Sequence, residues 1–99
     1  MGNNLNIPHE KITEFCIKNN IRKLSLFGSV LRNDFQHDSD VDVLVEFKVG
    51  QGPGFFGLAR MERELSEILG RKVDLRTPQE LSIYFRDQVL STAVVQYAQ

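Results

Sequence analysis

Two segments separated by five mostly polar residues determine the fold. They read Leu26-Phe27-Gly28-Ser29-Val30-Leu31-Arg32 and Asp38-Ser39-Asp40-Val41-Asp42-Val43-Leu44-Val45. The first ends an apolar alternation at a glycine, and the second opens a run with valine at every other position. Side chains alternate between the two faces of a strand, so Asp40 and Asp42 point the same way if residues 40–46 are extended. Neighbouring carboxylates are the hard oxygen ligands that Mg²⁺ takes together with substrate phosphates. The two segments therefore predict a site for a metal-bound nucleoside triphosphate.

Periodicity predicts the elements around this site. Apolar residues at helical spacing predict a helix through Ile12, Phe15 and Cys16, and another from Leu58 to Leu69 that Gly70 ends. Alternation predicts strands over residues 22–27, 41–47 and 72–76. Residues 29–32 are expected to form a turn or a short helix, and residues 33–39 and 50–54 to form loops.

The C-terminal quarter carries a helix signal followed by an ambiguous segment. Thr77-Pro78-Gln79-Glu80 combines an N-cap threonine, a first-turn proline and a capping-box glutamate, which predicts a helix continuing through Leu81, Tyr84 or Phe85, and Val89. Residues 94–97 favour a short edge strand over an extension of that helix. The order of elements predicts an α/β fold in which helices cover mainly one face of a small mixed sheet.

Composition limits the classes of function. The 99 residues predict a single domain spanning residues 1–99, and 41% hydrophobic with 25% charged residues is typical of an ordinary globular protein. A net charge of −1 and a pI near 6.1 argue against stable binding of nucleic acid. No apolar run is long enough to span a membrane. Cys16 is the sole cysteine, so no internal disulfide can form, and a cytoplasmic location is expected.

A third carboxylate, Asp74, lies between Val73 and Leu75 in a predicted strand. Aspartate is disfavoured inside strands, so both Asp42 and Asp74 break a local rule, as functional residues often do. Asp40, Asp42 and Asp74 are therefore the predicted metal ligands and catalytic residues. One or two ions held by them would activate an attacking oxygen and stabilise the departing pyrophosphate, with Asp74 near the attacking hydroxyl as its base.

The glycine turn supplies the predicted contacts to the nucleotide. Gly28 would let backbone amides approach the phosphates, and the hydroxyl of Ser29 would add a donor. Arg32 could pair with a phosphate, or with a loop carboxylate such as Asp38. Ser39, directly before Asp40, completes the nucleotide-binding set.

At these residues the chain resembles the minimal nucleotidyltransferases of the DNA polymerase beta superfamily. Their signature is Gly-Ser, a spacer of about ten residues, Asp-x-Asp, and a later strand aspartate, with Gly-Ser-x-x-Arg as a common form of the turn. One departure is Asn33, where relatives commonly have glycine. The resemblance implies an α/β fold, Mg²⁺ dependence, and transfer of a nucleoside monophosphate, expected to be AMP from ATP, to a hydroxyl.

The resemblance also implies a partner. Many minimal nucleotidyltransferases are antitoxins that adenylylate a tyrosine of a helical HEPN ribonuclease toxin. Larger relatives add an acceptor-binding domain that is not recognised in this chain, so a partner or a second copy in a homodimer is expected to complete the acceptor pocket. Two alternatives stay open: an antitoxin that neutralises by binding alone, and a transferase acting on a small hydroxylated molecule such as an aminoglycoside.

Overall fold

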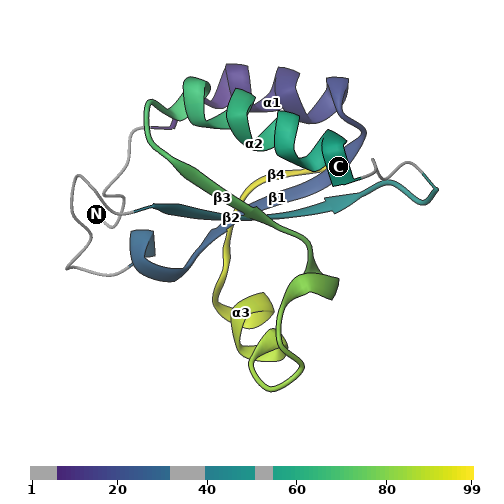
Figure 1. Cartoon of the computed structure of the whole chain (residues 1–99), viewed down its shortest axis with the longest axis vertical. Helices are drawn as coiled ribbons and strands as arrows, with labels where there is room; N and C mark the ends of the chain where they lie inside the picture. Colours follow the sequence, from purple (N-terminus) through teal and green to yellow (C-terminus); the bar gives the residue numbers. More distant parts are fainter. Residues whose placement is uncertain (1–6, 32–39, 51–54) are drawn as a thin grey trace.

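The computed structural model describes residues 7–31, 40–50 and 55–99. A layer of two helices packs on one face of a sheet, and a shorter helical segment lies on the other face (Figure 1). In chain order, the elements are α1 (His9–Lys18), β1 (Ile21–Phe27), the 3₁₀ helix η1 (Gly28–Leu31), β2 (Val41–Phe47), α2 (Phe55–Leu69), β3 (Val73–Arg76), the 3₁₀ helix η2 (Pro78–Glu80), α3 (Arg86–Thr92) and β4 (Val94–Ala98).

The described strands form one sheet in the order β3-β2-β1-β4. β1 is antiparallel to both β2 and β4, whereas β2 and β3 are parallel. A parallel pair needs a crossover connection, and α2 supplies it between β2 and β3. The predicted α/β fold with a small mixed sheet is therefore confirmed, as is the predicted C-terminal strand.

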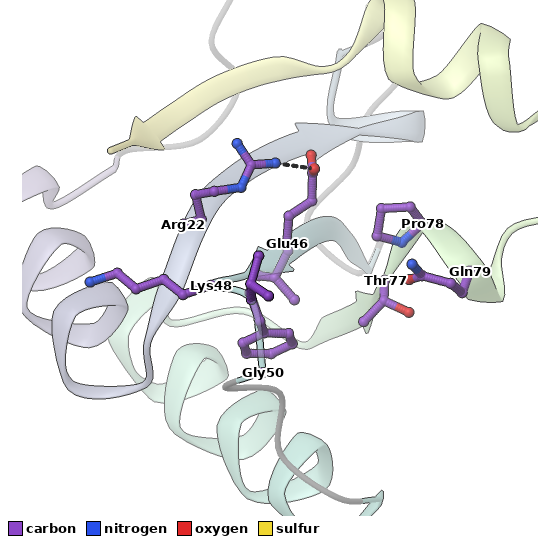
Figure 2. Close-up of a pocket in the computed structure, with 10 residues that line it drawn as sticks. Arg22, Glu46, Lys48, Gly50, Thr77, Pro78 and Gln79 are labelled. Atoms are coloured by element: carbon purple, nitrogen blue, oxygen red, sulfur yellow. Dashed lines mark hydrogen bonds and ion pairs between the residues drawn. The ribbon is translucent and has the colours of Figure 1, made fainter.

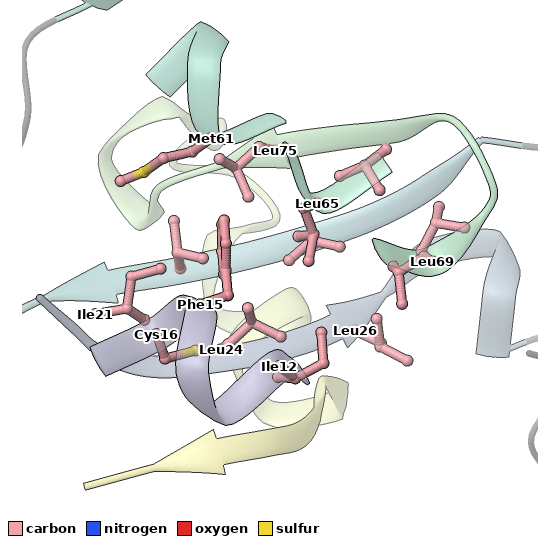
Figure 3. Packing of buried hydrophobic residues seen from close by; sticks show 14 of the residues in the cluster. Ile12, Phe15, Cys16, Ile21, Leu24, Leu26, Met61, Leu65, Leu69 and Leu75 are labelled. Atoms are coloured by element: carbon pink, nitrogen blue, oxygen red, sulfur yellow. The ribbon is translucent and has the colours of Figure 1, made fainter. Parts of the chain in front are cut away.

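The main core lies between the sheet and the pair α1 and α2 (Figure 3). Phe15 of α1 and Leu65 of α2 are almost completely buried, and they meet inward side chains of the central strands, such as Val43. The helical spacing that predicted α1 and α2 thus marks the faces that these helices bury. Within the described residues, none of the helices combines the length and the apolar character that a bilayer crossing requires.

The opposite face of the sheet is partly covered. Leu44 points away from the main core yet is only 2% exposed, and Leu81 is also buried. Leu81 follows η2, which contacts β2, and α3 lies on this same side of the sheet (Figure 1). Leu44 breaks the polar alternation of its strand because its face is covered at this point.

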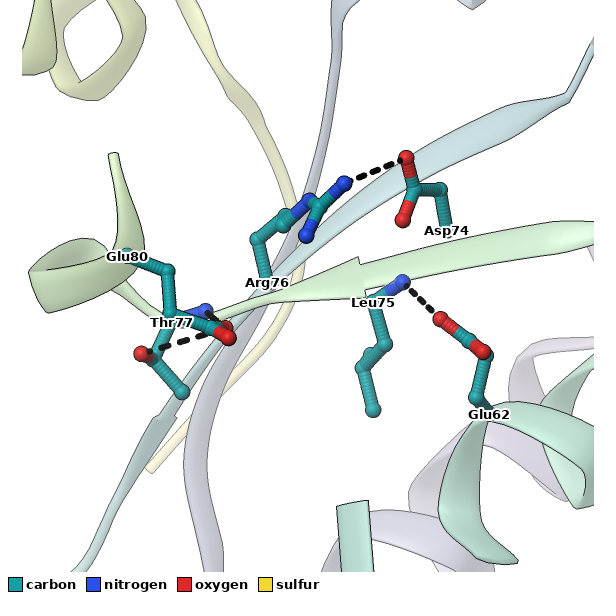
Figure 4. Close-up of polar contacts among 6 residues, drawn as sticks. All are labelled: Glu62, Asp74, Leu75, Arg76, Thr77 and Glu80. Atoms are coloured by element: carbon teal, nitrogen blue, oxygen red, sulfur yellow. Dashed lines mark hydrogen bonds and ion pairs between the residues drawn. The ribbon is translucent and has the colours of Figure 1, made fainter. Parts of the chain in front are cut away.

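The prediction of one continuous helix from Thr77 through Val89 is wrong. The capping-box contact forms, with the Thr77 amide donating to Glu80 Oε1 at 2.9 Å, but the helix ends after one turn (Figure 4). Leu81 takes an extended conformation (φ −80°, ψ 145°) and is buried. A new helix begins only at Arg86, and Tyr84, predicted as part of an apolar stripe, is 92% exposed. Burial of Leu81 therefore outweighs the local preference for a longer helix.

The outer edge of β3 is covered by side chains of α2. The amide of Val73 donates to Ser66 Oγ at 3.0 Å, and the amide of Leu75 donates to Glu62 Oε2 at 2.8 Å (Figure 4 shows the second). Edge strands leave a row of backbone groups without partners unless something covers them. Helix α2 therefore fixes the strand that carries Asp74 from the side opposite β2.

Candidate active site

The carboxylate of Asp42 lies against Gly28. β1 ends at Phe27, which is the register partner of Asp42 on β2, so the chain turns beside this aspartate. Gly28 has a φ of +76°, and a Cβ built on it would lie 3.1 Å from Cγ of Asp42 and closer still to Oδ2. The Asp42 carboxylate occupies the space that any other residue at position 28 would need. Only glycine fits the turn, both for its backbone angle and for this close approach.

Asp74 lies beside Asp42 on the next strand. The two are register partners in the parallel pair of β2 and β3, so their side chains leave the same face of the sheet. This is the face opposite α1 and α2, because Val41, Val43, Val73 and Leu75 point into the main core. Asp74 is half-buried and accepts a hydrogen bond from Arg76 Nη2 at 3.1 Å (Figure 4). Two of the three predicted carboxylates therefore take adjacent positions on one face.

Asp40 is exposed and directly precedes β2. Among the residues that the structure describes, no three His, Cys, Asp or Glu side chains form a group that could hold a metal ion. The donor set nevertheless suits Mg²⁺, which is commonly bound by one or two carboxylates together with phosphate oxygens of its nucleotide. A common ligand set of Asp40, Asp42 and Asp74 stays a prediction.

The predicted phosphate-binding residues are only partly described. Gly28 and Ser29 lie in η1, so the short helix expected near residues 29–32 forms at Gly28–Leu31. The position of the Ser29 side chain is not among the described features, and Arg32 and Ser39 lie outside the described residues. Their contacts with a nucleotide stay predictions.

A pocket of about 300 Å³ opens away from these carboxylates, where the end of β2 approaches Pro78 (Figure 2). Arg22 and Glu46 lie on its wall and pair with each other at 2.6 Å. Their charges largely offset one another, and Glu46 is four positions along β2 from Asp42. This pocket therefore holds none of the predicted catalytic residues.

Arg76 is the residue near the site that sequence reasoning missed. Its guanidinium pairs with Asp74, two positions earlier on the same strand. The sequence Asp74-Leu75-Arg76 could have indicated this contact, because residues two apart on a strand share a face. Arg76 thus places a positive charge beside a predicted catalytic carboxylate.

Cys16 is expected to be chemically inert in the folded protein. Its side chain is completely buried in the main core, and burial raises the pKa of the thiol to about 12. Because the thiolate is the reactive form, iodoacetamide should label the native protein at about pH 8 at least about 100-fold more slowly than the denatured chain. Mass spectrometry of the alkylated cysteine measures both rates. Equal rates would show that Cys16 is accessible and would reopen the question of its reactivity.

Comparison with known proteins places this geometry in context. The family model described as polymerase beta, nucleotidyltransferase matches residues 10–99. A candidate protein adenylyltransferase, MJ0435 of Methanocaldococcus jannaschii, is 37% identical over 91 residues, which cover 92% of this chain and 96% of the relative.

Solved structures agree with the fold. A toxin–antitoxin complex with AMP-PNP contains a chain that superposes with a TM-score of 0.75 at 20% identity, covering 94% of this chain and 75% of that one. A complex of a tri-AMPylated Shewanella oneidensis HEPN toxin with an MNT antitoxin contains a chain that superposes with a TM-score of 0.67 at 20% identity, covering 92% of this chain and 70% of that one. At these identities the structural likeness concerns the fold alone.

Proposed function

Because this chain belongs to the polymerase beta nucleotidyltransferase family and is itself a nucleotidyltransferase, we propose that it transfers AMP from ATP to a hydroxyl of a protein. The acceptor that we propose is a tyrosine of a HEPN ribonuclease toxin, which makes this chain the antitoxin of the pair. The observation that carries the assignment is the placement of Asp42, which lies against the Gly28 turn and beside Asp74.

The proposed reaction is an in-line displacement at the α-phosphorus of ATP. The acceptor oxygen forms a bond to the α-phosphorus, the bond from that phosphorus to the β-phosphate bridging oxygen breaks, and pyrophosphate leaves. The hydroxyl proton passes to the carboxylate of Asp74, which leaves the face of β3 opposite α1 and α2, and then to solvent. When bound, Mg²⁺ neutralises the charge that develops on the phosphate oxygens.

Each residue of the site has a proposed task. Asp40 and Asp42 hold the ion that accompanies ATP, and Asp74 orients the attacking hydroxyl. Gly28 brings the backbone of η1 close to the phosphates, where Ser29, Arg32 and Ser39 complete the contacts. Helix α2 keeps β3 in place through Glu62, so Asp74 remains beside Asp42.

Relatives support the choice of donor and acceptor. The name of the Methanocaldococcus relative describes transfer of an adenylyl group to protein. The structural neighbours include chains of toxin–antitoxin complexes, one solved with AMP-PNP and one containing a tri-AMPylated HEPN toxin. A protein hydroxyl is therefore favoured over a small-molecule hydroxyl as the acceptor.

A direct transfer assay tests the proposal. The chain is incubated with magnesium, ATP labelled at the α-phosphate, and the purified product of the neighbouring gene. We expect label on that partner with release of one pyrophosphate per AMP, and mass spectrometry should locate AMP on a tyrosine. Replacing that tyrosine with phenylalanine is the control and should abolish labelling. Neutralisation of the toxin in cells by an Asp40→Ala variant that transfers no AMP would instead favour an antitoxin that acts by binding alone.

A further inference from the structure

Exposed apolar side chains gather near the C-terminal end of the described chain. Of the eight large hydrophobic residues that are exposed among the described residues, six lie between positions 83 and 95. Ile83 is 72% exposed, and its neighbours Tyr84 and Phe85 are exposed as well. Val94 is the register partner of Leu26, which faces the main core, so its side chain leaves the other side of the sheet from α3. We call the remaining five residues the 83–95 surface: Ile83, Tyr84, Phe85, Leu90 and Val95. Exposed apolar residues that lie together on a protein surface usually mark an interaction site.

The chain's own fold does not bury this segment. Helix α3 has seven residues, none of them buried, and no residue of α3 belongs to the main core. Helices this short are marginal in water and depend on packing for their stability. A surface brought by another molecule would supply the packing that α3 lacks.

The 83–95 surface and the candidate active site lie on the same side of the sheet. Asp42 and Asp74 leave the face opposite α1 and α2, and α3 lies on that side too (Figure 1). A macromolecule seated on α3 and on the segment before it would therefore extend along the face from which the carboxylates project. This is the position that a protein acceptor needs in order to bring a hydroxyl to the nucleotide.

Charge defines what the surface can bind. Between residues 82 and 99 the charged side chains are Arg86 and Asp87, which are opposite in sign. Arg86 is already engaged within the chain, since Nη2 donates to the carbonyl oxygens of Leu81 at 3.0 Å and Gln79 at 3.4 Å. Asp87 is exposed, so a single negative charge accompanies the aromatic and aliphatic side chains here. Such side chains with few charges among them are typical of the centre of a protein–protein interface. The matching surface is mainly apolar, and the exposed negative charge does not suit nucleic acid.

A second copy of the chain is a less suitable occupant. Pairing of two copies through β4 would need a regular edge, but β4 is bulged, with a register shift between Leu24 and Ser25 of β1. Bulges twist an edge strand away from further pairing. The side chain of Gln96, next to Val95, also meets His9 Nε2 at 3.2 Å and ties β4 to α1.

We propose that the 83–95 surface docks the acceptor protein through an apolar helical face and so places the accepting hydroxyl over Asp42 and Asp74. This inference rests on the proposed function and identifies where its partner binds. Ile83, Tyr84 and Phe85 form the centre of the contact, and Leu90 of α3 extends it.

A matched pair of isoleucines tests the docking. Ile83 and Ile17 are both largely exposed, at 72% and 60%, but Ile17 lies on α1 across the sheet. Affinity for the purified HEPN product of the neighbouring gene is measured by calorimetry without ATP, for wild type, Ile83→Ser, Tyr84→Ser and Ile17→Ser. We expect Ile83→Ser and Tyr84→Ser to weaken binding at least about 30-fold and Ile17→Ser to leave it unchanged. Thermal unfolding of each variant alone should match wild type, because all three side chains are exposed.

The results separate docking from chemistry. An Asp42→Asn variant should bind the partner with wild-type affinity while transferring no AMP. If wild type transfers nothing but its binding still depends on Ile83, the docking inference stands and the proposed function fails. Unchanged affinity of both Ile83→Ser and Tyr84→Ser would overturn the docking inference. A wild-type dimer that Ile83→Ser dissociates, with partner binding intact, would overturn it in favour of self-association.

Discussion

Gly28→Ala is expected to lower AMP transfer at least about 100-fold, because it forces the Asp42 carboxylate out of its place. The substitution has two costs. A φ of +76° is unfavourable for alanine by roughly 1 kcal/mol, and the new Cβ meets Asp42 at distances that real side chains do not adopt. Either the turn opens or the aspartate moves, and both separate the backbone of η1 from the carboxylate. Single-turnover transfer to the partner measures the effect.

Gly70→Ala is the matched control for this effect. Gly70 also has a positive φ, +67°, but a Cβ there meets nothing within 4 Å. It should carry the same backbone cost of roughly 1 kcal/mol, read as a lower melting temperature, with transfer unchanged. If the two variants lose activity equally, backbone strain alone explains the result and the contact between Gly28 and Asp42 has no catalytic role.

Asp42→Asn is expected to reduce transfer by about 1,000-fold or more at saturating ATP. Asparagine preserves the shape of the side chain and fits beside Gly28, so the loss would come from the missing charge on the oxygen proposed to bind the metal. The fold should be retained, as checked by thermal unfolding. Raising the magnesium concentration should recover part of the activity if the variant binds the ion more weakly.

Glu10→Gln serves as the comparison for Asp42→Asn. Glu10 is an exposed carboxylate in the first turn of α1, across the sheet from the candidate site, and its amide variant should transfer AMP at the wild-type rate. Activity of Asp42→Asn within a few-fold of wild type would show that Asp42 is not a metal ligand. The proposal that Asp40 and Asp74 bind the ion together with Asp42 would then fail.

The central strands could be predicted because buried apolar residues recur at alternate positions along them. Val41, Val43 and Val45 occupy alternate positions of β2, and the same period in β3 places Asp74 on the opposite face from Val73 and Leu75. Gly28 could be predicted because a glycine that ends an apolar strand commonly turns the chain. These signals come from residues that are close in the sequence, so they do not depend on how the rest of the chain folds.

Other features depend on contacts between residues that are distant in the sequence. The periodicity of apolar residues carries no information about such contacts. The pairing of Asp42 with Asp74 follows from the register of two parallel strands, set by the α2 crossover rather than by either strand alone. The break after η2 arises because Leu81 is buried in an extended conformation, against a strong local helix signal. A capping box identifies where a helix begins but says nothing of its length. The metal set remains a prediction from the sequence pattern.

The hydrogen bonds from Val73 and Leu75 to side chains of α2 also affect how the protein behaves at high concentration. With those amides already engaged, β3 offers a poor template to a strand from an unfolded or neighbouring molecule. Amyloid-like stacking would therefore have to start elsewhere. The strand that carries Asp74 is thereby protected from pairing with other molecules, so this edge of the sheet should not nucleate aggregation.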